Sequence, residues 1–318
     1  MTTRRLILAA PALLAATRAS AQTWQPERAI TMIVAFAAGG GTDVAARTLG
    51  RFMERELGQS IVIQNRAGAG GEIGWAELAR SRPDGLTIGF INTPNIVTIP
   101  IERQARYKLD DFAPIANVVD DPGGFWVLPD SPWQNLQHLA AAARERPGEI
   151  AYGTTGVGSD DHLATLTFER ATGTRLLHVP FNGSAQVKNA ILGRTIQLAA
   201  MNMGEGVNDF RQGVLRPIGQ MAETRWVNTP EVPTFREQGF DVVDGSLRGI
   251  AAPAGTPQPV LRRLADVVKA VMATPDFMAS ATQQQLPLRF LDPDQHRAVL
   301  VGMNETYTKM WREHPWRD

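Results

Sequence analysis

The pattern of apolar and polar residues is most distinctive between residues 30 and 57. Residues 30–36, ITMIVAF, form a near-continuous apolar run, which is typical of a strand buried on both faces. Three glycines follow this run. Apolar residues then recur at helical spacing, at Ala46, Leu49, Met53 and Leu57. The pattern predicts a strand, a glycine loop and a helix that begins at Thr42 as its N-cap.

The alternation of strand and helix continues to residue 91. Strands are predicted over residues 30–36, 60–64 and 86–91, and helices over residues 42–57 and 71–81. Strands that alternate with helices form a parallel sheet covered by helices. We therefore expect an α/β fold for this first block.

A second alternating block is predicted from residue 125 to residue 244, after an irregular segment over residues 107–121. Its strands are expected over residues 125–128, 150–152, 176–179, 196–200 and 216–220, with helices between them. Residues 249–252 are small and apolar, and predict a strand that returns to the first block. A helix over residues 258–273 and a last long helix after Pro293 complete the predicted elements.

The two blocks predict two α/β domains, each a mostly parallel sheet flanked by helices. We expect residues 22–124 and 249–318 to form a discontinuous first domain, and residues 125–248 to form the second. No long polar linker separates the blocks. The domains should therefore be joined by short crossings that can act as a hinge.

The first glycine loop has the chemistry of an anion site. Gly39, Gly40 and Gly41 let a ligand come close to bare backbone N–H groups. The N-terminus of the next helix adds unpaired N–H groups and the positive end of the helix dipole. A glycine turn that binds nothing is the alternative interpretation, and three consecutive glycines favour binding over it.

A second loop repeats this chemistry in the second block. Residues 153–162, GTTGVGSDDH, again lead from a strand through glycines into a helix, with Ser159 as a good N-cap. Thr154 offers a hydroxyl group, and Gly156 and Gly158 offer close backbone N–H groups. Two such loops in separate domains predict a ligand held in a cleft between them.

Asn92 and Thr93 are candidate polar contacts in the same cleft. They follow the third predicted strand, and ligands of parallel sheets bind beyond the carboxyl ends of the strands. A simple turn before Pro94 explains these two residues equally well.

The first 22 residues, MTTRRLILAAPALLAATRASAQ, have the organisation of a signal peptide. A basic head precedes a short apolar centre, and Ala19-Ser20-Ala21 is a small-x-small cleavage site that predicts Gln22 as the mature N-terminus. The apolar centre is about ten residues long, whereas a membrane span needs about 20. Arg4 and Arg5 also suit a twin-arginine signal, so the general and the twin-arginine export routes both remain open.

Charge and composition exclude several classes of protein. Removal of residues 1–21 takes away three of 32 basic residues and no acid, so the mature charge is 29 minus 32, or −3. No basic patch for nucleic acid is apparent. The chain has no cysteine, which excludes disulfides, thiolate catalysis and cysteine zinc sites. Neither residues 39–43 nor the later glycine-rich residues 68–74 match a nucleotide-binding motif.

Familiar catalytic motifs are also not apparent in the sequence. The five histidines form no familiar metal spacing, and no G-x-S-x-G motif is present. His162 lies beside the second glycine loop and could act as a base. A structural hydrogen bond in the first turn of a helix is the interpretation we favour for it. We expect no catalytic residue, no metal and no cofactor.

Several segments together resemble the substrate-binding proteins of tripartite tricarboxylate transporters, the Bug receptors. They occur in the family's order and cover nearly all of the mature chain: AFAAGGGTDVAAR, VIQNRAGAGGEIG, PDGLTI, AYGTTGVGSDDHLA, HVPFNGSAQV, VPTFREQGF and APAGTP. The resemblance implies a two-domain periplasmic binding protein of type II-like fold. It implies capture of a small organic carboxylate between the domains for the permease subunits of a membrane transporter, without catalysis. We expect a monomer in the periplasm.

The resemblance also implies the residues that contact the ligand, on main-chain N–H groups and ordered waters of the two glycine loops. The candidates in the first domain are Ala37, Ala38, Gly39, Gly40, Thr42, Asn92 and Thr93. Those in the second domain are Thr154, Gly156, Gly158, Ser159, Asp160, Asn182 and Gly183. A periplasmic sensor for a signalling system needs the same cleft and remains an alternative, with a hydrolytic enzyme as a weaker one.

The chain departs from the family pattern at four places. Ala37 and Ala38 replace two prolines before the glycines, which restores freedom of φ to the loop. Asn182 stands where relatives often carry a cation, and Leu247 where they often carry tryptophan. Asp160 and Asp161 lie in the first turn of a helix expected to bind an anion, which they oppose by their charge.

Overall fold

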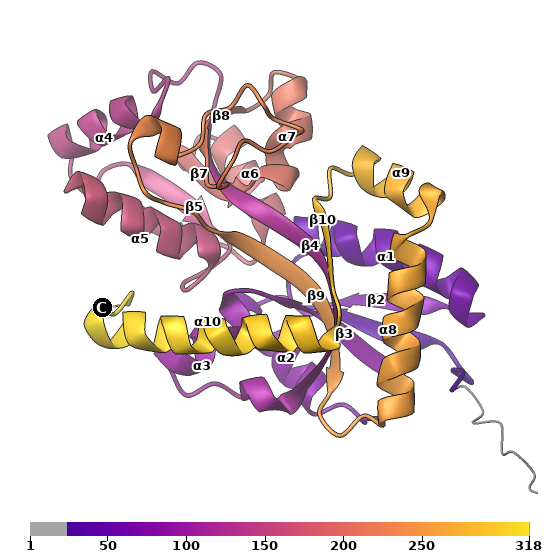
Figure 1. The fold of residues 1–318 in the computed structure, drawn as a ribbon. Coiled ribbons are helices and arrows are strands. Elements are labelled where there is room, and N and C mark those ends of the chain that lie inside the picture. Colours follow the sequence, from indigo (N-terminus) through magenta and orange to yellow (C-terminus); the bar gives the residue numbers. More distant parts are fainter. Residues whose placement is uncertain (1–23, 318) are drawn as a thin grey trace, which may run out of the picture.

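The computed structural model describes residues 24–317, so the predicted signal peptide lies outside the described residues. Two α/β domains lie side by side, and two long strands run from one into the other (Figure 1). The two-domain fold predicted from the sequence is confirmed. Among the described residues, no helix is long and apolar enough to span a bilayer.

The first domain is built on three parallel strands in the order β2-β1-β3: β1 (Ile30–Val34), β2 (Ile61–Asn65) and β3 (Thr87–Asn92). Its helices are α1 (Gly41–Leu57), α2 (Glu72–Ala79), α3 (Asn95–Glu102), α8 (Gln258–Met272), α9 (Pro275–Gln283) and α10 (Pro293–Glu313). Successive side chains of a strand point to opposite faces. Ile30 and Met32 therefore pack in the core with α1 and α8, while Ile33 packs in a second core with α2 and α10.

The second domain repeats this arrangement with the order β7-β5-β6: β5 (Ala151–Thr154), β6 (Leu177–Pro180) and β7 (Leu198–Asn202). A further strand of this domain, β8 (Arg216–Gln220), pairs antiparallel with the end of the long strand over residues 112–127. The helices are α4 (Leu136–Glu145), α5 (Asp160–Thr172), α6 (Ser184–Leu192) and α7 (Met203–Arg211). Phe125, Phe168 and Phe235 pack edge to face at the centre of this core.

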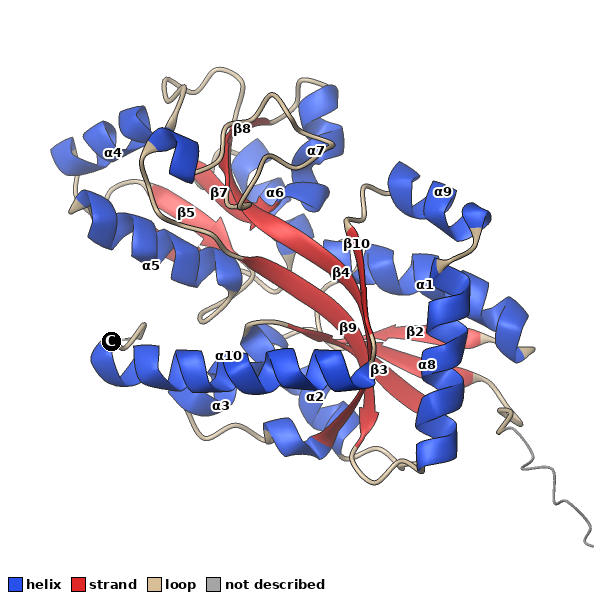
Figure 2. Cartoon of the chain, viewed as in Figure 1, coloured by secondary structure: helices blue, strands red, loops and turns tan. Residues whose placement is uncertain are grey.

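The prediction that residues 107–121 are irregular is wrong, because most of them belong to a 16-residue strand, β4 (Phe112–Val127). Residues 120–124, DDPGG, interrupt the apolar pattern and hide the strand from sequence reasoning. In the structure β4 pairs antiparallel with β9 (Gly245–Pro253) from Phe112 to Pro122. Its last residues pair with β7 and β8 of the second domain. Figure 2 shows β4 and β9 running together between the domains.

The predicted return strand over residues 249–252 is confirmed as part of β9, which also pairs with β3. Both domain boundaries expected from the sequence fall inside β4 and β9, and their positions stay a prediction. The sequence analysis missed α3, α9 and a short strand, β10 (Leu288–Leu291), that pairs with β4. Pro100 lies inside α3, and because proline is unfavourable in the interior of a helix, the sequence of this segment does not predict one.

Candidate functional site

A small cavity lies where the first glycine loop meets the second domain. Its volume is about 20 Å³, space for about one water molecule. Its polar lining includes Thr42, Asn92, Asn95, Thr155, Asp160, Ser184, Asn202, Glu205, Ser246 and Arg248. The glycine loop, the N-terminal ends of α5, α6 and α7, and strand β9 therefore converge on one point between the domains.

Helix α1 begins at this cavity. Its N-cap is Gly40, without a side-chain cap, so the prediction of Thr42 as N-cap is wrong. The Thr42 hydroxyl instead accepts a hydrogen bond from Asn92 Nδ2 at 2.7 Å. The first N–H of the helix, on Gly41, donates to Glu205 Oε1 at 3.2 Å and to Ser184 Oγ at 3.4 Å. The N-terminus of α1 thus binds a carboxylate oxygen that the protein itself supplies.

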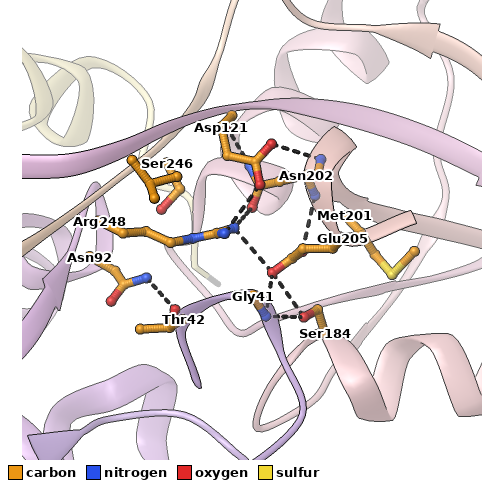
Figure 3. A network of polar contacts seen from close by, with 12 residues as sticks. Gly41, Thr42, Asn92, Asp121, Ser184, Met201, Asn202, Glu205, Ser246 and Arg248 are labelled. Carbon is orange, nitrogen blue, oxygen red and sulfur yellow. Dashed lines mark hydrogen bonds and ion pairs between the residues drawn. The ribbon is translucent and has the colours of Figure 1, made fainter. Parts of the chain in front are cut away.

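Glu205 is held there by its own helix. Asn202 and Glu205 form a capping box at the start of α7, in which the Asn202 N–H donates to Glu205 Oε2 at 3.2 Å. The other oxygen, Oε1, accepts from the Gly41 N–H, from Ser184 Oγ at 2.9 Å and from Arg248 Nη2 at 3.1 Å. Three donors from different elements converge on this one oxygen (Figure 3).

Arg248 brings a cation into the cleft from strand β9. Its side chain is 2% exposed and bonds Asn202 Oδ1 at 2.9 Å, with Asp121 Oδ2 3.1 Å from its Nη1. Burial alone would lower the pKa of Arg248, but the charges of Glu205 and Asp121 hold it above its ordinary value. The cation that Asn182 seemed to leave missing is therefore present, on a different element.

Further carboxylates surround this guanidinium. Burial raises the pKa of Asp121 to about 7 and that of Asp160 to about 6, although the charge of Arg248 acts in the opposite direction. Asp160 Oδ2 accepts from Asn202 Nδ2 at 2.7 Å. Burial also raises the pKa values of Asp161 and Asp244 well above the ordinary range.

The structure brings together only part of the predicted site. Gly40, Thr42, Asn92, Asp160 and Gly183 line the cavity. Ala38, Gly39 and Asn182 are exposed and do not line it, although Gly39 lines a second, larger cavity. The Asn182 carbonyl accepts a hydrogen bond from the Ala37 N–H at 3.1 Å, so these two residues join the domains through their backbones.

The cavity lining includes Thr155 and Asp160 of the second glycine loop, whereas Thr93, Thr154 and Ser159 support the cleft without lining the cavity. The Thr93 hydroxyl accepts from the Leu247 N–H at 2.9 Å and fixes β9. In the loop, the Thr154 hydroxyl bonds both the N–H and the carbonyl of Gly156. Ser159 caps α5 by accepting from the His162 N–H, as predicted, and the Gly158 carbonyl accepts from Thr98 Oγ1 across the domain boundary at 2.7 Å.

His162 has the structural role favoured from the sequence. Its Nδ1 accepts from the Gly158 N–H at 3.2 Å, and its ring stacks on His178 with 4.1 Å between centroids. Burial, with a smaller contribution from His178, lowers the pKa of His162 to about 3. The ring does not line the cavity.

Sequence reasoning missed Ser184, Asn202, Glu205 and Arg248. Two signals in the sequence point to them. Residues 202–205, NMGE, have the spacing of a capping box, and Arg248 is the one charged residue in the otherwise uncharged stretch 245–253. A charge in a buried strand needs a partner, which identifies such a residue as a member of a polar cluster.

A larger cavity of about 140 Å³ lies on the other side of the same cluster. Gly41, Ser184, Glu205 and Arg248 line both cavities and separate them. The larger one is also lined by Lys188 and Asp209, whose side chains form an ion pair at 2.6 Å.

Comparison with known proteins identifies close similarities over the whole chain. Residues 45–302 match the model of the tripartite tricarboxylate transporter family receptor. BugT of Bordetella pertussis is 34% identical over 299 residues, which cover 92% of this chain and 91% of BugT.

Solved structures show the same similarity. The periplasmic binding protein BugD superposes with a TM-score of 0.85 at 30% identity, over 91% of this chain and 98% of BugD. MatC of Rhodopseudomonas palustris with bound malate gives 0.83 at 25% identity, over 89% and 99% of the two chains. An R. palustris protein with adipate gives 0.86 at 26% identity, over 90% and 97%.

Proposed function

Since the chain belongs to the tripartite tricarboxylate transporter receptor family, whose members are periplasmic solute-binding proteins, we propose that it captures a small organic carboxylate between its two domains. The captured acid is delivered to the permease subunits of a membrane transporter. The protein works as a monomeric receptor.

One observation carries the proposal of a carboxylate ligand. The Gly41 N–H, the Ser184 hydroxyl and the Arg248 guanidinium all donate to a single carboxylate oxygen of Glu205. Charge-assisted bonds of this kind are the strongest that a protein offers to an acid. The donor set suits a carboxylate oxygen of a ligand equally well.

The relatives support the same ligand chemistry. Malate is bound to MatC, and adipate to the second R. palustris protein, and both are small dicarboxylates. We propose that the ligand of this chain contacts the residues of the cavity lining given above, with the N-terminus of α1 as its main anion site. The Asn182 side chain belongs to the rim.

A thermal-shift screen of mono-, di- and tricarboxylates tests the proposal. A ligand that binds only the folded state adds about 2.7 kcal/mol to the free energy of unfolding at about 100 times its Kd, which raises the melting temperature. We expect at least one acid to raise it and to be recovered unchanged. If no acid gives a shift, or if one is steadily consumed, the receptor assignment is wrong.

We further propose that residues 1–21 are removed on export, so that Gln22 is the first residue in the periplasm. The small-x-small site after a short apolar stretch supports this cleavage. N-terminal sequencing of the exported protein tests it, and recovery of the uncleaved chain in the membrane fraction would contradict it.

A further inference from the structure

A third cavity, of about 710 Å³, lies on the other side of strands β4 and β9 from the candidate site. Asp121 pairs with Arg248 on the side of the candidate site. Their chain neighbours, Asp120 and Leu247, line this third cavity instead. Successive side chains of a strand point to opposite faces, so the two strands separate the cavity from the carboxylate cleft. We call it the rear cavity, and its volume is in the range of small-molecule sites.

Both domains contribute to the lining of the rear cavity. Helix α10 of the first domain supplies Val299, Gly302, Met303 and Tyr307. The second domain supplies residues 221–224, which follow β8, and residues 243–244, which lead into β9. The shape of the rear cavity therefore depends on how the two domains are placed relative to each other.

The charged groups of the rear cavity are mostly acidic. Among the described residues that line it, Asp120, Glu223 and Asp244 are acids, and Arg289 is basic. The Arg289 guanidinium is already engaged, because it lies 2.6 Å from the Asp120 carboxylate. A cation that enters the cavity can pair with Glu223 or Asp244, whereas an anion would have to compete with Asp120 for Arg289.

Asp244 is the acid best placed to bind such a cation. Its Oδ1 accepts a hydrogen bond from the Gly245 N–H at 2.8 Å. Burial and the charge of Asp160 raise the pKa of Asp244 well above the ordinary range, and this N–H acts in the opposite direction. Tyr307 lies close enough that, after burial, the charge of Asp244 contributes most to raising the pKa of its hydroxyl. A cation beside Asp244 would thus gain both a carboxylate and a nearby aromatic ring.

Much of the remaining lining is apolar. Met221, Val243, Leu247, Val299 and Met303 all line the rear cavity. The methionine side chains can adapt to the shape of a ligand, because they are unbranched and flexible. An acidic group with apolar side chains around it suits a ligand that has one positive charge and an apolar body.

We propose that the rear cavity is a second ligand site, which binds a small organic cation with an apolar body. The ammonium group of this ligand binds the Asp244 carboxylate near Tyr307, and its apolar body packs on the methionine and valine side chains. The site itself does not depend on the proposed carboxylate function. Its coupling to the carboxylate cleft rests on that function.

Occupancy of the rear cavity should favour the closed carboxylate cleft. In this structure the domains are in contact across the cleft, for example through the hydrogen bond from the Gly41 N–H to Glu205, while the rear cavity is open. Because the two lie on opposite faces of β4 and β9, a rotation about these strands that widens the cleft narrows the rear cavity. A cation that fits the rear cavity as it stands therefore stabilises the closed arrangement and raises the affinity for the acid.

Calorimetry at pH 7.5 with phenethylamine, a primary amine on an apolar ring, tests the site. Its matched neutral probe is 2-phenylethanol. We expect the amine to bind about tenfold more tightly than the alcohol, and Asp244→Asn to weaken amine binding by about tenfold. Asparagine still accepts from the Gly245 N–H but carries no charge. Asp241→Asn is the control, since Asp241 is 84% exposed and pairs with Arg236, and it should bind the amine as the wild type does.

Gly302 allows the rear cavity to be filled by substitution. A Cβ added to Gly302 meets no atom within 4 Å, and tryptophan is less unfavourable than glycine inside a helix. Gly302→Trp should abolish amine binding. It should also raise the affinity for the most tightly bound acid from the thermal-shift screen by about threefold, as saturating phenethylamine should in the wild type. Val301→Trp is the matched control, because Val301 is 48% exposed and does not line the cavity. Circular dichroism checks the fold of each variant.

The outcomes separate the cation site from its coupling and from the receptor function. Equal binding of phenethylamine and 2-phenylethanol, or binding of neither, overturns the cation site. Undiminished amine binding in both Asp244→Asn and Gly302→Trp overturns it as well. An acid affinity that changes neither with the amine nor in Gly302→Trp overturns the coupling alone. If no acid binds in the screen, the receptor proposal fails, while the amine titrations still decide the cation site.

Discussion

Gly41 is a residue at which the two domains are in direct contact in the candidate site. A Cβ added to Gly41 would lie 2.5 Å from both Arg248 Nη1 and Glu205 Oε1. Real side chains do not approach so closely, so any larger residue separates α1 from the cluster. Glycine here permits the backbone N–H of α1 to reach an acidic group directly.

Gly41→Ala should therefore weaken binding of the most tightly bound acid from the thermal-shift screen by about tenfold. This factor corresponds to roughly 1.4 kcal/mol of binding free energy. The fold should persist, because alanine is the best helix former and α1 begins at this residue. Calorimetry measures the affinity and circular dichroism the fold. Gly50→Ala in the same helix is the control, since its Cβ would make ordinary contacts at 3.4 Å with Ile61. Equal affinities of Gly41→Ala and the wild type would contradict the site.

At the scale of the elements, α10 packs against strand β9 through a buried histidine. The ring of His296 is fully buried beside Gly249, and neither of its nitrogens has a hydrogen-bond partner. Burial lowers the pKa of His296 to about 4, from an ordinary value of 6.5. The folded protein therefore binds a proton there less readily than the unfolded chain does.

Since the unfolded state binds the additional proton, the stability associated with His296 is present above pH 6.5 and is lost as the pH falls towards 4. The loss should reach about 2 kcal/mol at pH 5, from a shift of about 1.4 kcal/mol per pH unit. His296→Leu should lose less stability than the wild type between pH 7.5 and pH 5, measured by urea unfolding. His138→Gln, at an exposed histidine of α4, should behave as the wild type does. A loss in His296→Leu as large as that of the wild type would show that another group causes it.

The elements that could be predicted from the sequence are those whose signal is local. The apolar run of β1, the three glycines and the apolar stripe of α1 lie within 28 consecutive residues, from 30 to 57, and the structure places them as expected. Only the end of strand β4, within the predicted strand over residues 125–128, was found in this way. Its polar residue Asp121 is buried because Arg248, from β9, lies beside it.

Prediction of the site was also limited by contacts between residues that lie far apart in the chain. The first glycine loop was found by composition and spacing, Asp160 was a candidate through the family resemblance, and both line the cavity. Glu205 and Arg248 lie far apart in the chain, and their meeting depends on the folded arrangement of α7 and β9. A family motif also placed the Asn182 side chain in the cleft, whereas the structure exposes it.

At the scale of the whole molecule, the shared strands make the two domains one folding unit. The sheet runs without interruption from β2 to β6, with β9 and β4 between its two halves. If β4 separates from the sheet, its neighbours β9 and β7 lose a pairing partner. We expect a single unfolding transition by calorimetry, with equal calorimetric and van't Hoff enthalpies. Two resolved transitions would show that the domains unfold independently.

The carboxylate of Glu205 occupies the N-terminus of α1 and therefore competes with any ligand for this anion site. Every acid that uses this anion site first displaces an internal group, so its apparent Kd is its intrinsic Kd divided by the fraction of molecules in which Glu205 leaves the donors free. The affinity for the ligand can then change in evolution through substitutions in α6 and α7 that strengthen or weaken the hydrogen bonds to Glu205. Residues that never touch the ligand would thereby set the concentration at which the receptor fills.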